Sequence, residues 1–447
     1  MERLQRIAAA VTARPAPAPA AGGTTSGRPF TSLRVVEIAG SPAGAFTAKV
    51  FADYGCDVVK VEPKGGDPRR GAGEAWARGM GSQFAFFNTS KRSVELDLGA
   101  ADGLAALREL LQSADVLIES SAPNPLTPLE LGPLPPQLVR VLISPFGLSG
   151  PYAHFRSNVL TDDALGGHLI LSGEPDRPPF CRAGLHTQLG AGMNGFVGAM
   201  GALLARDRPG GIGRGQSVEI SHMEGMATMH QHTTSMWHNG GQIVLREGNQ
   251  QPGPYYTGGV YPCKDGFVFL CHAGSAKLDP FMDVLERETW ASDPSWKDDE
   301  RFNTQGARST LEGKKLFDAE LLNPRLATLT VEEICKLGEE ARSPLGPVPG
   351  MLEHIQDDHL AARDFWTQMP DQPELKFPTG PFFLNGQRSE PRPPPGGARP
   401  MLSSTQNSRR LKVDERGWPS GLRRCVQVAV YSCRRGFESH LTQKFFF

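Results

Sequence analysis

The stretch LRVVEIAGSPAGAFTAKVFADYGCDVVKVEP (residues 33–63) decides the fold class of this chain. It begins with a short run of β-branched residues, continues with apolar residues at helical spacing as far as Gly55, and ends in a second such run, DVVKVEP. The two runs predict strands, and the middle predicts a helix. Two strands joined by a helix lie parallel, and such crossovers are right-handed in nearly all proteins. The stretch therefore predicts the start of an α/β sheet.

The same alternation continues beyond this stretch. SVELDL (93–98) and DVLIES (115–120) have the pattern of strands, and the segment between them, ADGLAALRELLQSA (101–114), has that of an amphipathic helix. A further strand is predicted in LVRVLISPFG (138–147). We therefore predict a Rossmann-like large domain with a parallel sheet over residues 31–225.

Composition narrows the class of protein. With 447 residues, 39% hydrophobic and 21% charged, the chain is long enough for two or three folded domains. The net charge of −1 argues against a surface devoted to nucleic acid or membrane. No segment approaches the ~20 apolar residues of a membrane-spanning helix. The seven cysteines form no Cys-x-x-Cys pair, which favours a reducing cytoplasm over a disulfide framework or a zinc site.

The remaining sequence divides into four further regions. Residues 1–30 are rich in Ala, Pro, Gly, Ser and Thr and predict a disordered leader, with organellar import as a minor alternative. Residues 226–345 are predicted to form a smaller α+β domain with linkers, which includes the hairpin pattern YPCKDGFVFL (261–270). Residues 346–390 are predicted to return toward the large domain, and 391–447 to form an irregular tail.

Two loops of the predicted large domain are candidate anion sites. The loop after the first strand opens a helix, whose N-terminal N–H groups attract anions, but it lacks the G-x-G-x-x-G fingerprint of dinucleotide binding. The loop after the second strand carries Lys64, Arg69 and Arg70 among glycines at the carboxyl edge of the sheet. These cations either hold phosphates or belong to a solvated surface loop, and the residues alone leave both open.

Other polar residues have simpler interpretations. Asp176, in Gly-Glu-Pro-Asp-Arg-Pro-Pro (173–179), is typical of a surface turn when taken alone. Asp162 and Asp163 are expected to cap or flank a helix. His230 and His232 are two residues apart, which does not place them on one helical face, so we expect no metal site.

Several segments in a fixed order carry a family resemblance. Beyond the opening stretch they are NTSKRSVELDL (88–98), ADVLIES (114–120), ISPFGLSGPY (143–152), LSGEPDRPP (171–179), GIGRGQSVEIS (211–221), YPCKDGFVFL (261–270), DDERFNTQGAR (298–308) and Gly346-Pro-Val. Residues 33–381 thereby resemble the class III CoA-transferases, the family of formyl-CoA transferase and carnitine CoA-transferase. The resemblance implies a Rossmann-like large domain, a smaller domain and two monomers interlocked as linked rings.

The resemblance implies an acyl-CoA:carboxylate CoA-transferase that works through one aspartate. In that chemistry the carboxylate forms a mixed anhydride with the acyl group and then an aspartyl-CoA thioester, from which CoA passes to an acceptor acid. Asp176 stands at the family's Gly-x-x-Asp-Gly-Pro-Pro position. Arg177 replaces the usual glycine, and it either holds Asp176 ionised or crowds an incoming acid. The CoA thioester is a substrate, and no permanently bound cofactor or metal is expected.

The resemblance is weaker at the positions that contact CoA in this family. The expected CoA-binding positions are Pro42, Ala43, Lys64, Arg69, Leu96, Ser120 and Ser121. Several of them differ from the family's usual residues, so a CoA-binding protein without catalytic activity is an alternative. An α-methylacyl-CoA racemase is a second alternative. It is disfavoured because Asn158, Val159 and Thr187 stand where that branch has proton-transferring groups.

The C-terminal end departs from the family and changes the charge balance. Residues 409–447 carry nine Lys and Arg against three Asp and Glu, a net of +6, which leaves −7 on the remaining chain. The family's C-terminal ending and helix have no match there, which indicates a tail that is not an authentic part of the enzyme. A basic interaction tail is the alternative. The expected partners are acyl-CoA, small carboxylic acids and a second copy of the chain, and neither nucleic acid nor membrane.

Overall fold

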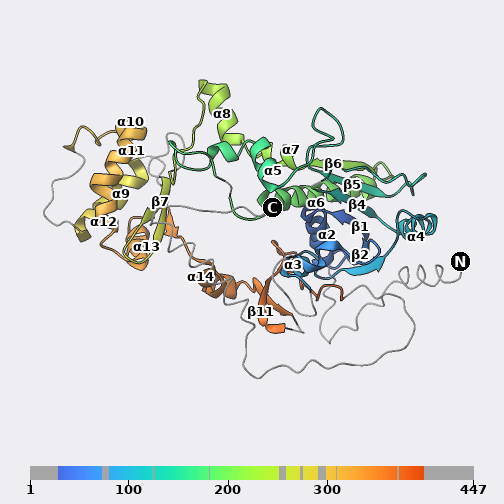
Figure 1. Ribbon diagram of the computed structural model, residues 1–447. Coiled ribbons are helices and arrows are strands. Elements are labelled where there is room, and N and C mark those ends of the chain that lie inside the picture. Colours follow the sequence, from blue (N-terminus) through green and yellow to red (C-terminus); the bar gives the residue numbers. More distant parts are fainter. Residues whose placement is uncertain are drawn as a thin grey trace.

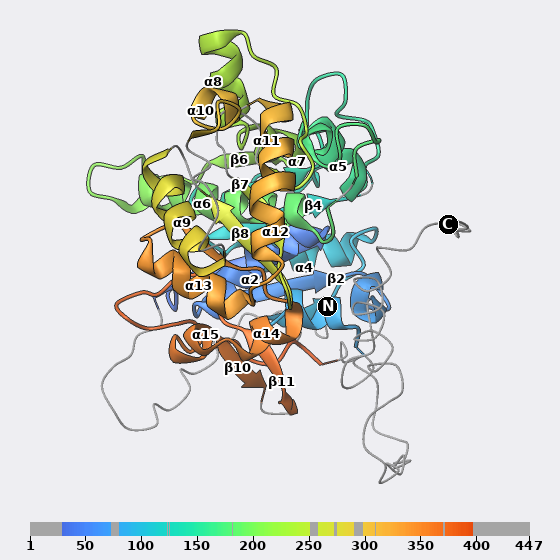
Figure 2. The same ribbon diagram turned by 90° about the vertical axis from the view of Figure 1, so that its left-hand side faces the viewer.

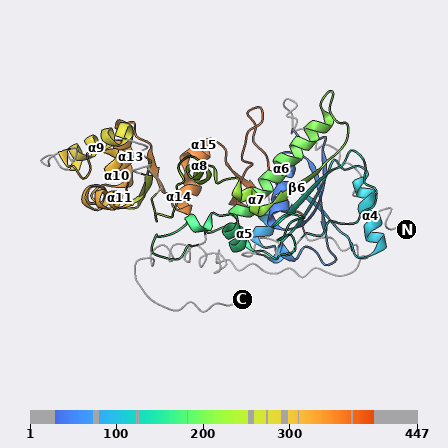
Figure 3. The same cartoon turned by 90° about the horizontal axis from the view of Figure 1, so that it is seen from above.

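The computed structural model describes residues 29–72, 80–122, 124, 126–180, 182–250, 258–271, 275–289, 298–308, 310–369 and 372–396. Most of the predicted leader and of the predicted tail lies outside these ranges. The described chain forms a lobe around a parallel sheet and a second lobe around α9 to α13 (Figure 1). Seen from above, α14 and α15 lie between the two lobes (Figure 3). None of the described helices is long and apolar enough to cross a membrane.

The large lobe contains six parallel strands in the order β3-β2-β1-β4-β5-β6. Their bounds are Arg34–Gly40 (β1), Asp57–Glu62 (β2), Arg92–Glu95 (β3), Val116–Ser121 (β4), Val139–Ser144 (β5) and Ser217–Ser221 (β6). This order is that of the Rossmann fold, so the predicted fold class is confirmed. The strand order reverses between β1 and β4, and their carboxyl ends form the switch point where such sheets bind ligands.

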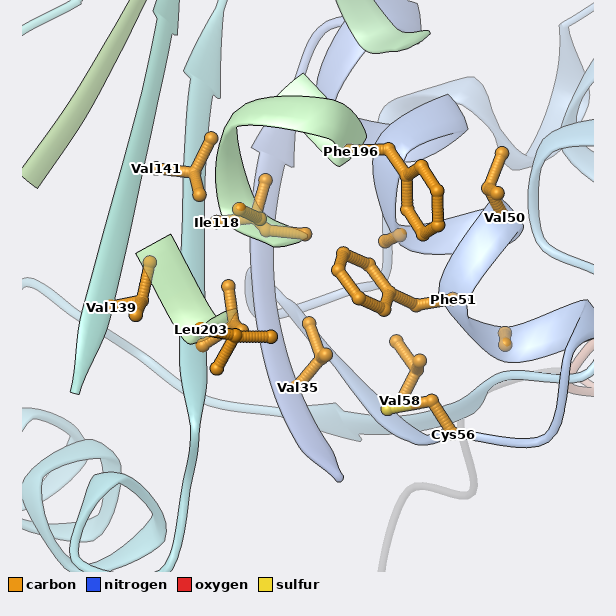
Figure 4. Close-up of a cluster of buried hydrophobic side chains, with 14 of the residues drawn as sticks. Val35, Val50, Phe51, Cys56, Val58, Ile118, Val139, Val141, Phe196 and Leu203 are labelled. Atoms are coloured by element: carbon orange, nitrogen blue, oxygen red, sulfur yellow. The ribbon is translucent and has the colours of Figure 1, made fainter. Parts of the chain in front are cut away.

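Helices cover both faces of this sheet. α2 (Pro42–Asp53) and α6 (His186–Asp207) pack on one face and α4 (Ala101–Leu111) on the other. The other helices of this lobe are α3 (Ser82–Phe87), α5 (Val159–Leu165), α7 (His222–Ala227) and α8 (Gln231–Gly240), with the 3-10 turns η1 (Pro68–Gly71) and η3 (Leu169–Leu171). Successive residues of a strand face opposite sides. Val35 therefore packs with Phe51 of α2 and Phe196 of α6, whereas Val36 packs with Leu107 of α4. Figure 4 shows the first of these clusters.

The small lobe is built on an antiparallel sheet in the order β7-β8-β9. Its elements are β7 (Gly258–Pro262), β8 (Phe267–Cys271), α9 (Ser275–Thr289), α10 (Gln305–Arg308), α11 (Leu311–Phe317), η5 (Asp318–Leu322), α12 (Asn323–Leu326), α13 (Val331–Glu340) and β9 (Leu345–Pro347). The predicted hairpin is the β7–β8 pair. One face of β8 joins a separate core in which Val268 and Leu270 pack with Phe281 and Phe317. In Figure 2 this lobe lies in front of the parallel sheet.

The segment after β9 leads back to the large lobe. It contains α14 (Met351–Gln356), α15 (Asp358–Ala362), β10 (Trp366–Met369) and β11 (Gln372–Pro378). Phe382 then stacks on Tyr54 of the large lobe with 4.2 Å between ring centroids, and its N–H donates to the Tyr54 hydroxyl at 3.0 Å. A Cβ on Gly380 would lie 2.4 Å from that hydroxyl, so only glycine fits there. The segment after β9 thus packs against the large lobe near the start of the chain. The domain limits given above remain predictions.

Candidate functional site

The switch point brings the N-terminus of α2 against the end of β4. Ser41 caps α2, since its Oγ accepts from the Gly44 N–H at 3.5 Å, and its own N–H donates to Ser120 Oγ at 3.3 Å. A Cβ on Gly44 would lie 2.2 Å from Ser120 Oγ, so the approach of helix to strand requires glycine. The partial positive charge of a helix N-terminus therefore faces this edge.

The structure places the expected CoA-binding residues of β1, β3 and β4 at different depths. Pro42 is the first residue of α2, but the Ala43 side chain has no exposed surface. Leu96, which follows β3, lies in the core cluster against α4. Ser120 is buried against α2, whereas the Ser121 hydroxyl donates to the Asn124 carbonyl at 3.0 Å. Pro42 and the two serines lie at the switch point, while Ala43 and Leu96 direct their side chains into the core.

The cationic loop after β2 is largely occupied with its own structure. Arg70 donates to both carboxylate oxygens of Glu62, at 2.7 and 2.6 Å. Arg69 donates to Asp67 at 2.8 Å and to the Ala39 carbonyl at the end of β1. Two of the three predicted phosphate-binding cations thus shape the loop. Lys64 is the one whose side chain extends into solvent.

Charged residues that were not predicted as part of the site are buried directly beneath this loop. Lys60 Nζ lies 3.0 Å from Glu37 Oε1 and 2.9 Å from Asp67 Oδ2, and Lys91 Nζ lies 2.6 Å from Glu37 Oε2. Burial, opposed by Glu37 and assisted by Lys60, lowers the pKa of Lys91 to about 8. Although burial acts to raise it, the pKa of Glu37 is lowered by the two lysines. The sequence does contain a signal for this cluster, because each of the first two β-branched runs has a charged residue inside it, Glu37 in the first and Lys60 in the second.

Asp176 lies on the exposed loop between η3 and α6. Neither Asp176 nor the adjacent Arg177, also exposed, forms an ion pair with another residue in the described ranges. The loop is held from outside, because the Gly248 N–H donates to the Gly173 carbonyl at 3.0 Å and Arg246 Nε donates to the Glu174 carbonyl at 2.8 Å. No motif in the sequence indicated Arg246 as a site residue.

The two aspartates of α5, Asp162 and Asp163, are buried in the interior of the large lobe. Asn158, rather than either aspartate, caps α5 through a reciprocal pair of bonds with Thr161. Asp162 is fully buried, and its Oδ2 lies 3.0 Å from Nδ1 of His222 in α7. Asp163 is buried as well and accepts a hydrogen bond from the Thr187 hydroxyl. The expectation that these aspartates cap or flank a helix is therefore wrong, because both lie within α5 and join it to neighbouring helices.

The histidines considered for a metal site have protein partners. His230 Nε2 lies 2.8 Å from the Gly166 carbonyl, and its Nδ1 lies 3.0 Å from Thr233 Oγ1. Among the residues that the structure describes, no group of three or more His, Cys, Asp or Glu side chains is placed to hold a metal ion. His230 thus joins α8 to the end of α5.

A family model and curated proteins that are similar to this chain point to the same family, and a solved structure shares its fold. Residues 31–399 match the family described as CoA-transferase family III. The chain is 30% identical over 361 residues to succinyl-CoA–D-citramalate CoA-transferase of Chloroflexus aurantiacus, covering 78% of this chain and 86% of that protein. It is 30% identical over 371 residues to the BbsE subunit of succinyl-CoA:(R)-benzylsuccinate CoA-transferase of Thauera aromatica, covering 80% and 88%. A solved CAIB/BAIF family protein from Brucella suis shares the fold, with a TM-score of 0.70, 24% identity and 83% and 97% coverage.

Proposed function

We propose that this chain, which belongs to CoA-transferase family III, moves coenzyme A between carboxylic acids through a covalent intermediate on Asp176. The observation that carries the proposal is the state of Asp176. Its carboxylate is exposed and forms no ion pair with any described side chain, while the backbone on either side of it is tied to the segment that begins at Arg246. A nucleophile needs an unencumbered carboxylate on a fixed support.

The proposed reaction consists of acyl substitutions that need no proton and no oxidant. An Asp176 carboxylate oxygen attacks the thioester carbonyl carbon, the C–S bond breaks, and CoA leaves as a thiolate from the mixed anhydride. The thiolate attacks the aspartyl carbonyl carbon, releases the donor acid as a carboxylate and forms the aspartyl-CoA thioester. The acceptor carboxylate attacks that thioester to give a second anhydride and thiolate. Attack of this thiolate on the acceptor's carbonyl carbon restores the Asp176 carboxylate.

The switch point is the proposed place for coenzyme A. Pro42, Ser120 and Ser121 lie at this edge beside the N-terminus of α2, where backbone N–H groups favour phosphate oxygens. Lys64 extends from the neighbouring loop and supplies a mobile positive charge. Coenzyme A enters and leaves as part of the substrate, so the proposal requires no permanently bound cofactor.

Dicarboxylic acids are the proposed substrate class. D-Citramalate and (R)-benzylsuccinate, in the names of the two relatives, each carry two carboxylates, and succinyl-CoA, which both names contain, carries one free carboxylate beside its thioester. One carboxylate must react at Asp176, and the other needs a cation. The Arg177 guanidinium is adjacent, exposed and without an ion-pair partner among the described residues. A guanidinium matches the planar geometry of a carboxylate with two parallel hydrogen bonds.

The proposal extends to assembly and compartment. An interlocked homodimer would cover exposed apolar side chains of α6, where Val197 and Leu204 are 61% and 66% exposed. Light scattering on the purified protein reports the number of copies directly. The cytoplasm is the proposed compartment because its reducing conditions preserve free thiols, and the described Cys56, Cys263, Cys271 and Cys335 are all free.

The test is a CoA-exchange assay with succinyl-CoA as donor and a panel of mono- and dicarboxylic acids as acceptors. Wild-type protein should form the acceptor's CoA thioester, and Asp176→Asn should abolish exchange, because an amide is a poor nucleophile. Asp298→Asn changes another exposed carboxylate and serves as the matched control. CoA binding without exchange for any acid would instead support a binding protein. Deuterium uptake at the α-carbon of a 2-methylacyl-CoA would support a racemase.

A further inference from the structure

The loop that carries Asp176 has little internal support. Within Ser172–Phe180 the backbone bonds are Arg177 N–H to the Glu174 carbonyl at 3.3 Å and Phe180 N–H to the Ser172 carbonyl at 3.2 Å. Both are longer than the most common N–H···O distance of about 2.9–3.0 Å. The conformation of the loop therefore depends on groups that lie outside it.

Arg246 supplies the main external support. Its Nε donates to the Glu174 carbonyl at 2.8 Å, and its Nη2 donates to the Arg177 carbonyl at 2.5 Å, with a longer contact of 3.5 Å to the Pro175 carbonyl. These carbonyls lie on both sides of Asp176 in the chain. A planar guanidinium presents its donors in a rigid fork, so one side chain fixes both flanks of the nucleophile.

The segment Arg246–Gln250, which we term the strap, is itself held by the small lobe. Glu247 Oε2 lies 2.6 Å from Nζ of Lys314 in α11, whose side chain is only 2% exposed. Gln250 Nε2 donates to Asp318 of η5 at 2.7 Å and to the Tyr261 hydroxyl of β7 at 3.0 Å. The strap thus connects the small lobe to the loop of the large lobe.

Gly248 lets the strap approach the loop closely. Its φ of +67° is one that glycine adopts freely, and an added Cβ would lie 2.6 Å from a carboxylate oxygen of Glu174. Its N–H donates to the Gly173 carbonyl at 3.0 Å. The strap therefore makes backbone contact with the start of the loop while Arg246 holds its middle.

We propose that Arg246 is a positioning residue for Asp176 and that the strap makes the orientation of the nucleophile depend on the small lobe. The inference rests on the proposed function. In both halves of the reaction a nucleophile must approach a carbonyl carbon from above the plane of the carbonyl group, and the aspartyl group is first the nucleophile and then the electrophile. A loop free to rotate would lose that alignment, and a misplacement of about 1 Å costs on the order of 100-fold in rate.

The experiment measures the single-turnover rate at which the full-length protein forms an aspartyl-CoA thioester, trapped with hydroxylamine after mixing with succinyl-CoA. Arg246→Met should lower this rate by about 100-fold while CoA affinity changes little. Arg246→Lys should restore only part of the rate, because one ammonium cannot reproduce the fork. Methylguanidinium added to Arg246→Ala should restore activity, a response that a merely structural role would not give. Arg208→Met, at another exposed arginine, is the control.

Two variants test the strap without touching Arg246. Lys314→Met should lower the same rate to a smaller extent, and Gly248→Ala should lower it by displacing the strap from Glu174. If the thioester forms as fast in Arg246→Met and Lys314→Met as in the wild type, this inference is overturned and the proposed function stays intact. Absence of any trappable thioester in the wild type would instead overturn the proposed function and the inference with it. Circular dichroism and CoA binding of each variant separate these outcomes from loss of folding.

Discussion

His222 Nδ1 lies 3.0 Å from Asp162 Oδ2, and neither side chain has exposed surface. The pair joins α7, which follows the last strand of the parallel sheet, to α5, which leads into the segment that carries Asp176. Burying such groups is costly unless each has its partner. The pair therefore fixes the position of α5 against α7.

Removal of one partner from this pair should destabilise the large lobe. We expect His222→Leu to lower the free energy of unfolding by about 3–5 kcal/mol, because Asp162 would remain buried without its partner. Urea unfolding followed by circular dichroism gives this value. His238→Leu replaces an exposed histidine and should change stability little. The double variant Asp162→Asn/His222→Leu should recover part of the loss. A loss in His222→Leu no larger than that in His238→Leu would contradict the assignment.

Lys91 should give the stability of the protein a distinct pH dependence. Its pKa is lowered from 10.5 to about 8 by burial and by Lys60, against the attraction of Glu37. Below pH 8 the ammonium is charged in both states, and the cost of burying it is present in full. Between about pH 8 and 10.5 the unfolded chain binds more protons than the folded one, so this contribution to stability rises with pH.

The comparison of wild type with Lys91→Met isolates this effect. The difference in unfolding free energy between the two proteins should shift in favour of the wild type as pH rises through this range. Lys336→Met, at a residue whose side chain is 69% exposed, provides the control for the general effect of a lost lysine. A difference that stays constant from pH 7.5 to roughly pH 10 would show that the pKa of Lys91 is not lowered.

Arg177 should determine which acids are accepted. We expect Arg177→Gln to lower kcat/KM for succinate by about tenfold or more, because a hydrogen bond between charged groups contributes about 1.5–3 kcal/mol. The value for propionate, which has no second carboxylate, should change little. The exchange assay with both acids measures the ratio of kcat/KM for succinate to kcat/KM for propionate, and Arg208→Gln is the control. Equal losses for the two acids would place the role of Arg177 at Asp176 itself.

The sequence predicted the parallel sheet because its signals are local. Apolar runs of strand length alternate with helical spacing from Leu33 to Gly147, which predicts parallel strands joined by right-handed crossovers. The order of the strands in the sheet was not predicted, and the structure supplies it. The hairpin of β7 and β8 was equally visible in its turn, Lys264-Asp265-Gly266. Such patterns depend on neighbours within a few residues, which a single sequence records.

The features that the sequence did not reveal depend on contacts between distant residues. Lys60 and Glu37 stand among β-branched residues, and only the pairing of β1 with β2 shows that each compensates the other. Arg246 contacts a carbonyl 72 residues earlier in the chain. Asp176 itself was typical of a surface turn, and only the family resemblance distinguished it. Side-chain partners of this kind become visible only once the fold is known.

The most direct test of the central claim is to locate the covalent intermediate. Wild-type protein mixed with succinyl-CoA and quenched with hydroxylamine should yield, by mass spectrometry of its peptides, a hydroxamate on Asp176 and no other carboxylate. Asp176→Asn should yield none. Exchange that continues undiminished in Asp176→Asn, or a hydroxamate located on a different residue, would contradict the account.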